Sequence, residues 1–325
     1  MPHRIRVYEV GGPEKLCWEE SEVPDPGPTE VRVRNKAIGL NFVDTYYRSG
    51  LYATPLPFIP GSEGAGIVEA VGSKVKNFKM GDHVAYADPL GAYAEVVLRP
   101  SERLIKVPSQ IDLKVAAAIM LKGMTTHYLL RRTYKVKAGD IILMHAAAGG
   151  VGQILCPWAK HLGATVIGTV GSEEKVKIAK KAGCKHVIVT SRQKVSEEVR
   201  KITKGKGVPV VYDGVGKETF LDSLDCLAPL GLMVSFGNAS GAVAPLEIAM
   251  LSKKGSLFLT RPTLGTYTAK REDLEWAARE LFQVIKKGIV KVTINQTYPL
   301  QDAAKAHEDL KNRKTTGSTL LLPMS

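Results

Sequence analysis

The sequence predicts an α/β protein that combines a doubly wound parallel sheet with a second, β-rich domain. Three observations lead to this prediction. Apolar runs and helical stretches alternate regularly from about residue 138 to residue 260. The residues before 108 are divided by Gly and Pro into short β-type runs. At 325 residues the chain is also longer than one hydrophobic core usually supports, so two domains are expected.

The N-terminal part has the pattern of a compact β domain. Its clearest predicted strands are Val31–Gly39, Ala65–Val71, His83–Ala87 and Ala92–Leu98. From Leu113 to Tyr134 the pattern becomes helical and contains no proline, which is typical of a connection into the next domain.

Six strands are predicted in the following part: Ile141–Ala146, Thr165–Val170, His186–Val189, Val208–Tyr212, Leu232–Phe236 and Ser256–Thr260. The helical stretches between them provide the crossover connections of a doubly wound parallel sheet. Two helices, Arg271–Lys287 and Leu300–Lys311, and a strand, Ser318–Leu322, then return to the first domain. We therefore expect a β-rich domain over residues 1–122 and 263–325, and a dinucleotide-binding domain over residues 123–262.

The dinucleotide assignment depends on the segment that joins the first of these strands to a helix ending near Leu162. It reads His145-Ala-Ala-Ala-Gly-Gly-Val-Gly152. Free amides and the positive end of a helix dipole attract phosphate, and glycine lets the backbone approach it closely. Because a strand precedes the turn and a second strand follows at βαβ spacing, Gly149, Gly150, Val151 and Gly152 are predicted to bind a pyrophosphate.

Composition excludes several other classes of protein. The four cysteines are far apart and form no C-x-x-C pair, which argues against a zinc knuckle and fits the reducing cytoplasm. Neither a signal peptide nor a membrane span is expected. The net charge of +13 comes from Lys and Arg scattered over predicted helices such as Lys175–Lys181 and Lys194–Lys206. We interpret these residues as solvated faces, not as a nucleic-acid site.

Five blocks of sequence point to one family: Gly11–Glu14, Asn35–Tyr52, Lys122–Thr125, His145–Gly152 and Gly231–Asn238. Together they strongly resemble the zinc-independent NADPH:quinone oxidoreductases, the zeta-crystallin-like group of the medium-chain dehydrogenase/reductase superfamily. The resemblance covers essentially the whole chain. It implies a Rossmann domain, a GroES-like catalytic domain, NADPH as cofactor, a quinone bound between the domains, and a homodimer.

The same resemblance argues against zinc. Members of the superfamily that bind zinc have a cysteine ligand where this chain has Asn41 and a histidine where it has Ser62. Zinc prefers thiolate, imidazole or carboxylate ligands, so neither residue replaces them. Acceptors that are already electrophilic, such as quinones and enones, need no metal to accept hydride.

The end of the second strand of the dinucleotide domain bears on cofactor choice. Gly171, Ser172 and Lys175 can receive the 2′-phosphate of NADPH, and the quinone reductases have the same lysine there. Alternatively, Glu173 and Glu174 can accept hydrogen bonds from the ribose of NAD, or simply favour the start of a helix. We expect NADPH. Where the family often has a tyrosine this chain has Thr190, with Arg192 either compensating or merely exposed.

The resemblance also implies residues near the nicotinamide. It places Asn41, Phe42, Tyr46, Thr125 and Tyr128 along the cofactor, and Phe236, Ser240, Arg261 and Arg313 around its far side or the inter-domain cleft.

The tyrosines of the β-rich domain are candidates for the acceptor site. Tyr46 and Tyr52 are expected on one loop, with Arg48 between them, and together with Asn41 they are the predicted catalytic residues. A tyrosine hydroxyl can donate to a quinone oxygen, and its ring can hold a flat acceptor. Burial in the core is the alternative for both rings. For His145 we favour a buried structural role over acid–base catalysis.

The sequence thus predicts a cytoplasmic NADPH-dependent quinone reductase. Reduction of a carbon–carbon double bond in enones and hydride transfer to small aldehydes are the alternatives among enzymes. An RNA-binding protein that retains the Rossmann fold is the alternative outside them.

Overall fold

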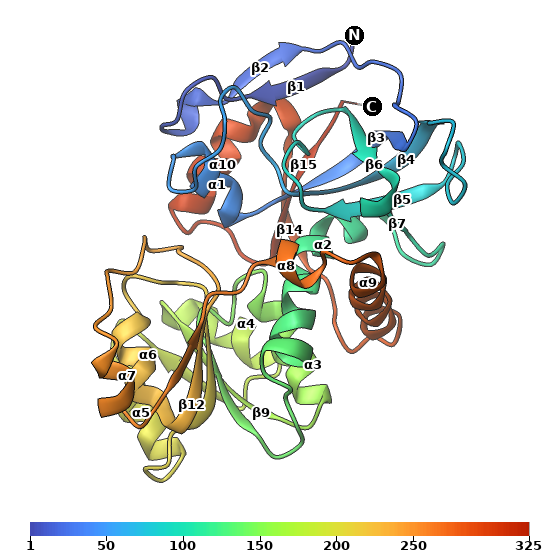
Figure 1. The fold of residues 1–325 in the computed structure, drawn as a ribbon. Coiled ribbons are helices and arrows are strands. Elements are labelled where there is room, and N and C mark those ends of the chain that lie inside the picture. Colours follow the sequence, from blue (N-terminus) through green and yellow to red (C-terminus); the bar gives the residue numbers. More distant parts are fainter. Residues whose placement is uncertain (325) are drawn as a thin grey trace. The chain divides into compact units, whose positions relative to one another are not determined.

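A computed structural model describes residues 1–324 (Figure 1). The chain forms two compact units. The first contains Met1–Met124, Thr268–Lys286 and the residues from Val292 onward, and the second contains Thr125–Tyr267 and Lys287–Lys291.

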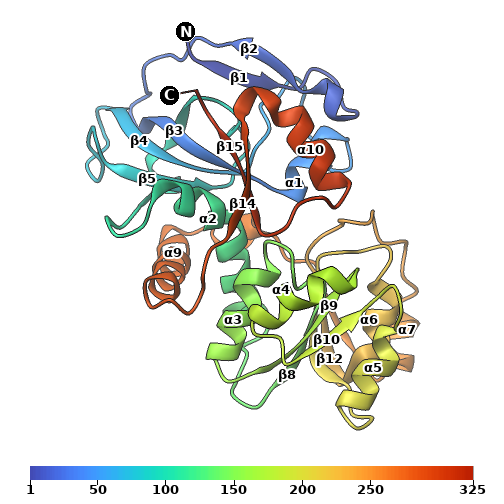
Figure 2. The same ribbon diagram turned by 180° about the vertical axis from the view of Figure 1, so that it is seen from behind.

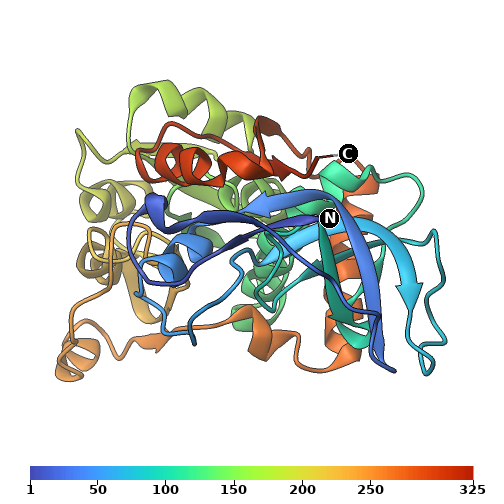
Figure 3. The ribbon, with the colours of Figure 1, turned by 90° about the horizontal axis from the view of Figure 1, so that it is seen from above.

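The first unit is built on a mainly antiparallel sheet of seven strands. Its order is β14-β15-β3-β4-β5-β7, with β6 also paired to β3 (Figure 1). Only β14 and β15 pair in parallel. The strands are β3 (Glu30–Leu40), β4 (Glu63–Val71), β5 (His83–Ala87), β6 (Val96–Pro100), β7 (Ile105–Lys106), β14 (Ile294–Pro299) and β15 (Ser318–Leu322). The N-terminal pair β1 (His3–Arg6) and β2 (Cys17–Glu20), dark blue in Figure 3, belongs to the same unit.

Four helices contribute to the first unit: α1 (Phe42–Arg48), the first part of α2 (Leu113–Tyr128), α9 (Arg271–Lys286) and α10 (Ala303–Lys311). Alternate residues of β3, such as Val31 and Val33, enter a core that also contains Ala303, Ala306 and Leu310. The C-terminal segment therefore completes the core of the N-terminal β unit.

The second unit is a parallel sheet of six strands in the order β10-β9-β8-β11-β12-β13. They are β8 (Ile141–Met144), β9 (Thr165–Val170), β10 (His186–Val189), β11 (Val208–Asp213), β12 (Leu227–Ser235) and β13 (Phe258–Thr260). The chain starts at a central strand, adds strands outward to one edge, and then does the same in the other direction. This order defines a doubly wound Rossmann sheet, so the predicted fold class is confirmed.

Helices connect the strands of this sheet: α3 (Gly152–His161), α4 (Val176–Lys181), α5 (Val195–Ile202), α6 (Phe220–Cys226), α7 (Ala249–Lys253) and α8 (Leu264–Tyr267). Helices α3 and α4 pack on β9 and β10, while α5 and α6 pack on each other (Figure 2). Val195 and Val199 of α5 and Phe220 and Leu224 of α6 enter the core beside Leu143 of β8.

Several predicted boundaries were wrong for identifiable reasons. The strand expected from Ala92 begins only at Val96, because the Asn35 amide donates to the carbonyls of Ala92 and Ala94 and holds this segment out of the ladder. The helix expected up to Lys206 ends at Ile202, where the Thr203 hydroxyl donates to the Val199 carbonyl and Lys204 adopts a φ of 53°. The helical stretch expected from Leu113 to Tyr134 is confirmed as far as Thr133: α2 is followed directly by a π-helical turn, Leu129–Thr133.

Among residues 1–324, every helix is too short or too polar to cross a membrane.

Candidate active site

The glycine turn of the second unit joins β8 to α3. The backbone reverses at Ala146, which has a positive φ of 52°. A Cβ atom on Gly152 would lie 2.5 Å from the carbonyl oxygen of Ala147, so only glycine fits where the helix meets the turn. No side chain caps the N-terminus of α3 at Val151. The amides of its first turn, at the positive end of a ten-residue helix, therefore fit a pyrophosphate.

Other predicted cofactor residues follow the carboxyl ends of neighbouring strands. Gly171 and Ser172 follow β9, Thr190 follows β10, Phe236 follows β12 and Arg261 follows β13. Because these strands are parallel, their carboxyl ends meet at one edge of the sheet, which is where doubly wound proteins bind nucleotides.

Backbone contacts fix several of these residues. The amide of Thr190 donates to the carbonyl of Val170 over 2.9 Å, and Arg261 donates to the carbonyl of Ser235 over 2.8 Å. The hydroxyl of Ser240 donates to the carbonyl of Val215 over 2.9 Å. The Phe236 ring lies against the backbone of Gly214, where a Cβ would approach it to 2.9 Å.

The region after β9 is open and contains cations. A Cβ on Gly171 would meet no heavy atom within 4 Å. Lys175 is half-buried at the end of a 3-10 turn, Glu173–Lys175. Arg192 forms an ion pair with Glu173 over 3.0 Å, so a second cation lies beside this segment and one of its two carboxylates, Glu173 and Glu174, is already engaged. Two cations with one remaining carboxylate fit a phosphate better than the two hydroxyls of a ribose.

His145 is buried and belongs to a polar network beneath the turn. Its Nδ1 lies 3.1 Å from the hydroxyl of Thr169, and its Nε2 lies 2.9 Å from the hydroxyl of Ser223. Burial lowers the pKa of His145. Asp213 accepts hydrogen bonds from the amides of Val215 and Gly216. With Ser223 also 3.2 Å from Asp213, the network joins the ends of β8, β9 and β11.

Tyr46 lies in the first unit on α1, so the expectation that Tyr46 and Arg48 lie on a loop was wrong. Asn41 and Asp44 form a capping box at the start of this helix, a signal present in the sequence as Asn-x-x-Asp. Tyr52 follows the helix, and its amide donates to the Tyr46 carbonyl over 3.1 Å. The two rings meet edge to face at 5.2 Å, which brings the predicted acceptor residues together.

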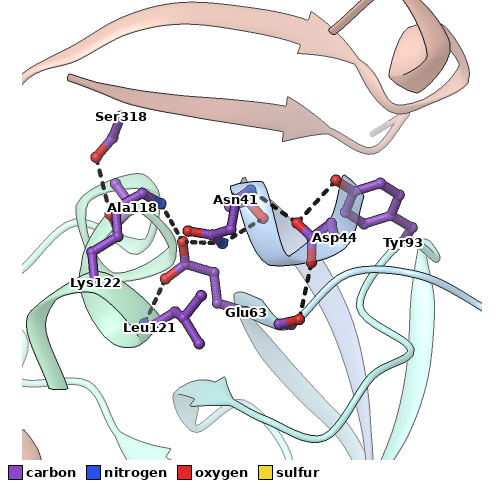
Figure 4. A network of polar contacts seen from close by, with 10 residues as sticks. Asn41, Asp44, Glu63, Tyr93, Ala118, Leu121, Lys122 and Ser318 are labelled. Carbon is purple, nitrogen blue, oxygen red and sulfur yellow. Dashed lines mark hydrogen bonds and ion pairs between the residues drawn. The ribbon is translucent and has the colours of Figure 1, made fainter. Parts of the chain in front are cut away.

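Two buried carboxylates lie beside Asn41 (Figure 4). Glu63 of β4 accepts hydrogen bonds from the Asn41 side chain over 2.9 Å, from Lys122 over 2.6 Å and from the Leu121 amide over 2.7 Å. A Cβ on Gly39 of β3 would lie 2.1 Å from a Glu63 oxygen. Position 39 must therefore be glycine to leave room for the Glu63 carboxylate.

The second carboxylate, Asp44, has three neutral donors and no cation within ion-pair distance among residues 1–324. It accepts hydrogen bonds from the Asn41 amide over 2.9 Å, the Ser62 hydroxyl over 2.9 Å and the Tyr93 hydroxyl over 3.2 Å. Burial raises the pKa of Asp44 to about 7, against the effect of the donors from Asn41 and Ser62.

Tyr93 connects Asp44 to α10. The Tyr93 hydroxyl lies 2.9 Å from His307 Nε2, and Arg48 donates to His307 Nδ1 over 3.2 Å. Burial, together with the positive charge of Arg48, lowers the pKa of His307 to about 3. Sequence reasoning missed Asp44, Glu63, Tyr93 and His307, because nothing local in the sequence shows that four separate segments meet here.

Asn41 and Ser62 are thus engaged with carboxylates in this chain. In residues 1–324 no group of three or more His, Cys, Asp and Glu residues is arranged to hold a metal ion. An amide and a hydroxyl that already donate to Glu63 and Asp44 do not fit zinc.

The remaining predicted residues are divided between the two units. Phe42 is half-buried on α1, and Arg313 is exposed in the first unit with a φ of 59°. Thr125 and Tyr128 lie on α2 in the second unit, where the Tyr128 ring stacks on Tyr267 at 4.6 Å.

A Rossmann unit with an uncapped glycine-turn helix, and a β-rich unit with paired tyrosines, define a dinucleotide-dependent oxidoreductase. Residues 27–109 match the family described as alcohol dehydrogenase GroES-like domain, and residues 150–283 match the family described as zinc-binding dehydrogenase.

Full-length relatives narrow the family. The chain is 55% identical to a quinone oxidoreductase of Pseudomonas aeruginosa, over 99% of this chain and all of that protein. It is 48% identical to a 2-haloacrylate reductase of a Burkholderia species, over 98% of each. The crystal structure of Escherichia coli quinone oxidoreductase complexed with NADPH superposes with a TM-score of 0.97 at 51% identity, covering 99% of this chain and all of that one. The chain belongs to the zinc-independent quinone oxidoreductase family of the medium-chain dehydrogenase/reductase superfamily.

The first prediction concerns metal content. Because Asn41 and Ser62 offer no zinc ligand, purified protein should contain no stoichiometric zinc, and treatment with a chelator should leave its activity unchanged. Elemental analysis by mass spectrometry measures the zinc content, and assays before and after chelation measure the change in activity. Zinc at one equivalent, with activity lost on chelation and restored by zinc, would contradict the assignment.

The second prediction concerns acid stability. His307 is neutral in the folded protein down to about pH 3, whereas an unfolded histidine takes up a proton below about pH 6.5. The unfolded chain binds more protons between these values, so the contribution of His307 to stability is lost as the pH falls. Relative to His307→Gln, the wild type should lose about 2 kcal/mol of unfolding free energy between about pH 6.5 and about pH 5. Urea unfolding at each pH measures this, and parallel pH curves would show that His307 titrates normally.

Proposed function

We propose that this protein reduces quinones with NADPH and without zinc. The observation that supports it most strongly is the combination of a phosphate-binding glycine turn with a site in which Asn41 and Ser62 are bound to carboxylates instead of a metal. The full-length similarity to quinone oxidoreductases, one of them complexed with NADPH, supports the same function.

The second unit holds the cofactor in this proposal. The first-turn amides of α3, with Gly149, Gly150, Val151 and Gly152, bind the pyrophosphate. Gly171, Ser172 and Lys175 bind the 2′-phosphate, with Thr190 beside them. Thr125, Tyr128, Phe236, Ser240 and Arg261 line the remainder of the cofactor site in this unit. NADPH supplies the hydride.

The first unit binds the acceptor. Tyr46 and Tyr52 provide an aromatic wall that aligns a flat quinone, and a tyrosine hydroxyl donates a hydrogen bond to the quinone oxygen on which negative charge develops. A neutral tyrosine hydroxyl can donate this hydrogen bond. Asn41, held by Glu63, sets the start of the helix on which Tyr46 lies. The domain division expected from the sequence, residues 1–122 with 263–325 and residues 123–262, corresponds to these two roles.

Reduction of an activated carbon–carbon double bond is the second candidate. One observation favours it, the 48% identity to a 2-haloacrylate reductase. An enone requires the same features of the site as a quinone does: alignment with the cofactor and a hydrogen-bond donor to the carbonyl oxygen. Identification of the product distinguishes the two reactions.

We also propose a homodimer that forms through the edge of the Rossmann sheet. Strand β13 is an end strand, and its Phe258 is 59% exposed. Leu259 of the same strand and Ile248 of the same unit are exposed as well. An apolar edge strand pairs readily with a second copy of itself around a twofold axis. A cytoplasmic location fits Cys17, Cys156, Cys184 and Cys226, all of which are free thiols.

The third prediction concerns cofactor choice. Lys175→Ala should weaken NADPH binding by about tenfold or more and leave NADH binding nearly unchanged, because only NADPH presents a 2′-phosphate to the ammonium group. Lys177→Ala, an exposed lysine on the following helix, is the matched control. Dissociation constants from fluorescence titration measure both. Equal weakening of the two cofactors would mean that Lys175 does not recognise the phosphate.

The fourth prediction concerns the acceptor. With NADPH and a panel of ortho- and para-quinones, Tyr52→Phe should lower kcat/KM by about tenfold through loss of a donor. Tyr52→Ala should lower it further, because the wall is lost too, while NADPH affinity stays constant in both variants. If none of the quinones supports NADPH oxidation by the wild type, but enones are reduced efficiently at the carbon–carbon double bond, the proposed quinone reductase is wrong. The double-bond reductase then becomes the proposed function.

The fifth prediction concerns assembly. Phe258→Glu should convert a dimer into a monomer, because the substitution places a charge on the edge strand. Leu221→Glu is the control, since Leu221 is also 59% exposed but lies on α6 away from that strand. Sedimentation velocity measures the mass of each. A monomeric wild type, or an unchanged dimer in Phe258→Glu, would exclude this interface.

A further inference from the structure

Helix α1 is too short to be stable alone, and hydrogen bonds fix both of its ends. At its start, the Asp44 carboxylate accepts the amide of Asn41. At its end, Arg48 donates from Nε to the carbonyl of Gly11 over 3.2 Å, and the Gly11 amide donates to the carbonyl of Arg48 over 2.9 Å. The position of the helix therefore depends on Asp44 and Arg48.

These two residues are also linked to each other from outside the helix. Asp44 and Arg48 are four residues apart and share one face of α1. Tyr93 contacts Asp44, His307 contacts Arg48, and Tyr93 and His307 contact one another at 2.9 Å. All four side chains are buried. Tyr93 and His307 thus bridge one turn of the helix, and we call these four residues the α1 clamp.

The hydrogen bonds of the clamp have a single direction. Arginine only donates, so Nδ1 of His307 accepts from Arg48 and the proton of the neutral ring lies on Nε2. Nε2 then donates to the Tyr93 hydroxyl, which in turn donates to Asp44. His307 and Tyr93 each accept a hydrogen bond from the residue before them in this chain and donate one to the residue after them. The clamp therefore fixes the distance between the two ends of the helix.

The opposite face of the helix presents Phe42 and Tyr46. Residue 46 is two positions beyond Asp44, or about 200° around the helix axis. Phe42 is four residues before Tyr46 and lies on the same side. Tyr46 also holds the start of the next segment, through its carbonyl bond to the Tyr52 amide and the contact between the two rings.

We propose that His307 and Tyr93 are positioning residues for quinone reduction, which act through Asp44 and Arg48 on α1 and thereby set the places of Tyr46 and Tyr52. Neither residue touches the acceptor in this role. The inference rests on the proposed function for the assignment of Tyr46 and Tyr52 to the acceptor. Its structural part, the control of α1 by the clamp, can be tested without any activity.

Tyr93→Phe tests the clamp with the smallest change, because it removes one hydroxyl and keeps the ring in the core. Tyr298→Phe is the matched control: its hydroxyl donates to Asp309 on α10 over 3.0 Å in the same unit, without contact to α1. Tyr93→Phe should lower kcat/KM for a quinone by about tenfold and speed amide exchange in residues 42–48. NADPH affinity should not change. Tyr298→Phe should leave all three quantities as in the wild type.

The histidine supplies a second pair of variants. His307→Gln retains a donor in the place of Nε2 and should keep most of the activity, whereas His307→Leu should behave like Tyr93→Phe. The double variant Tyr93→Phe with His307→Leu should be no worse than either single variant, because both interrupt the same chain of hydrogen bonds.

Three outcomes would overturn the proposal. The first is that Tyr93→Phe matches Tyr298→Phe in both kcat/KM and amide exchange. The second is that His307→Gln loses as much activity as His307→Leu, and the third is that the effects of the double variant add. If the wild type itself reduces no quinone, the proposed function fails, and amide exchange alone decides the clamp: faster exchange of α1 in Tyr93→Phe supports it, and unchanged exchange refutes it.

Discussion

The burial of two carboxylates, Asp44 and Glu63, is the constraint on which the β-rich unit depends. A buried carboxylate is costly unless hydrogen bonds or a cation compensate it. Glu63 has Lys122 as its cation, whereas Asp44 has only the neutral donors described above. The donors come from Asn41 between β3 and α1, from Ser62 just before β4, from Tyr93 in the loop before β6, and from α2. Satisfying the two carboxylates therefore brings together the segments around α1, where we propose that the acceptor binds.

In the proposed zinc-independent function, the same residues take over the structural role that the metal has in zinc enzymes of this fold. A divalent cation would provide charge compensation and a fixed geometry at once. Here Lys122 and the hydrogen bonds to Asp44 and Glu63 provide the compensation, and the capping box of α1 provides the geometry. The Rossmann unit has a different constraint, namely close approach of backbone. A Cβ on Gly168 would lie 2.6 Å from the sulfur of Cys184 and 2.7 Å from the Cβ of Ala147, so β9 packs directly beneath the glycine turn.

Much of this arrangement could be predicted from the sequence. The period of the apolar residues and the turn residues between them locate five of the six Rossmann strands to within a residue or two. For β12, only the C-terminal half was predicted, because Pro229 and Gly231 are residues that usually interrupt a strand. The glycine turn itself follows from local chemistry. Helix α1 was not predicted although Asn41-x-x-Asp44 marks its start, because its seven residues make too few turns to show a helical period. The clamp could not have been predicted, since Tyr93 and His307 are 214 residues apart and nothing local links them.

A directed chain of hydrogen bonds runs from Arg48 through His307 and Tyr93 to Asp44 and, as we propose, holds helix α1 in place. The nitrogen chemical shifts of His307 in ¹⁵N-labelled protein test it most directly, because they report which ring nitrogen bears the proton. We predict one protonated nitrogen, Nε2, and an unprotonated Nδ1 at every pH from about 5 to about 8. A proton on Nδ1, or a ring that titrates within this range, would contradict the account, because Arg48 could then no longer donate to His307.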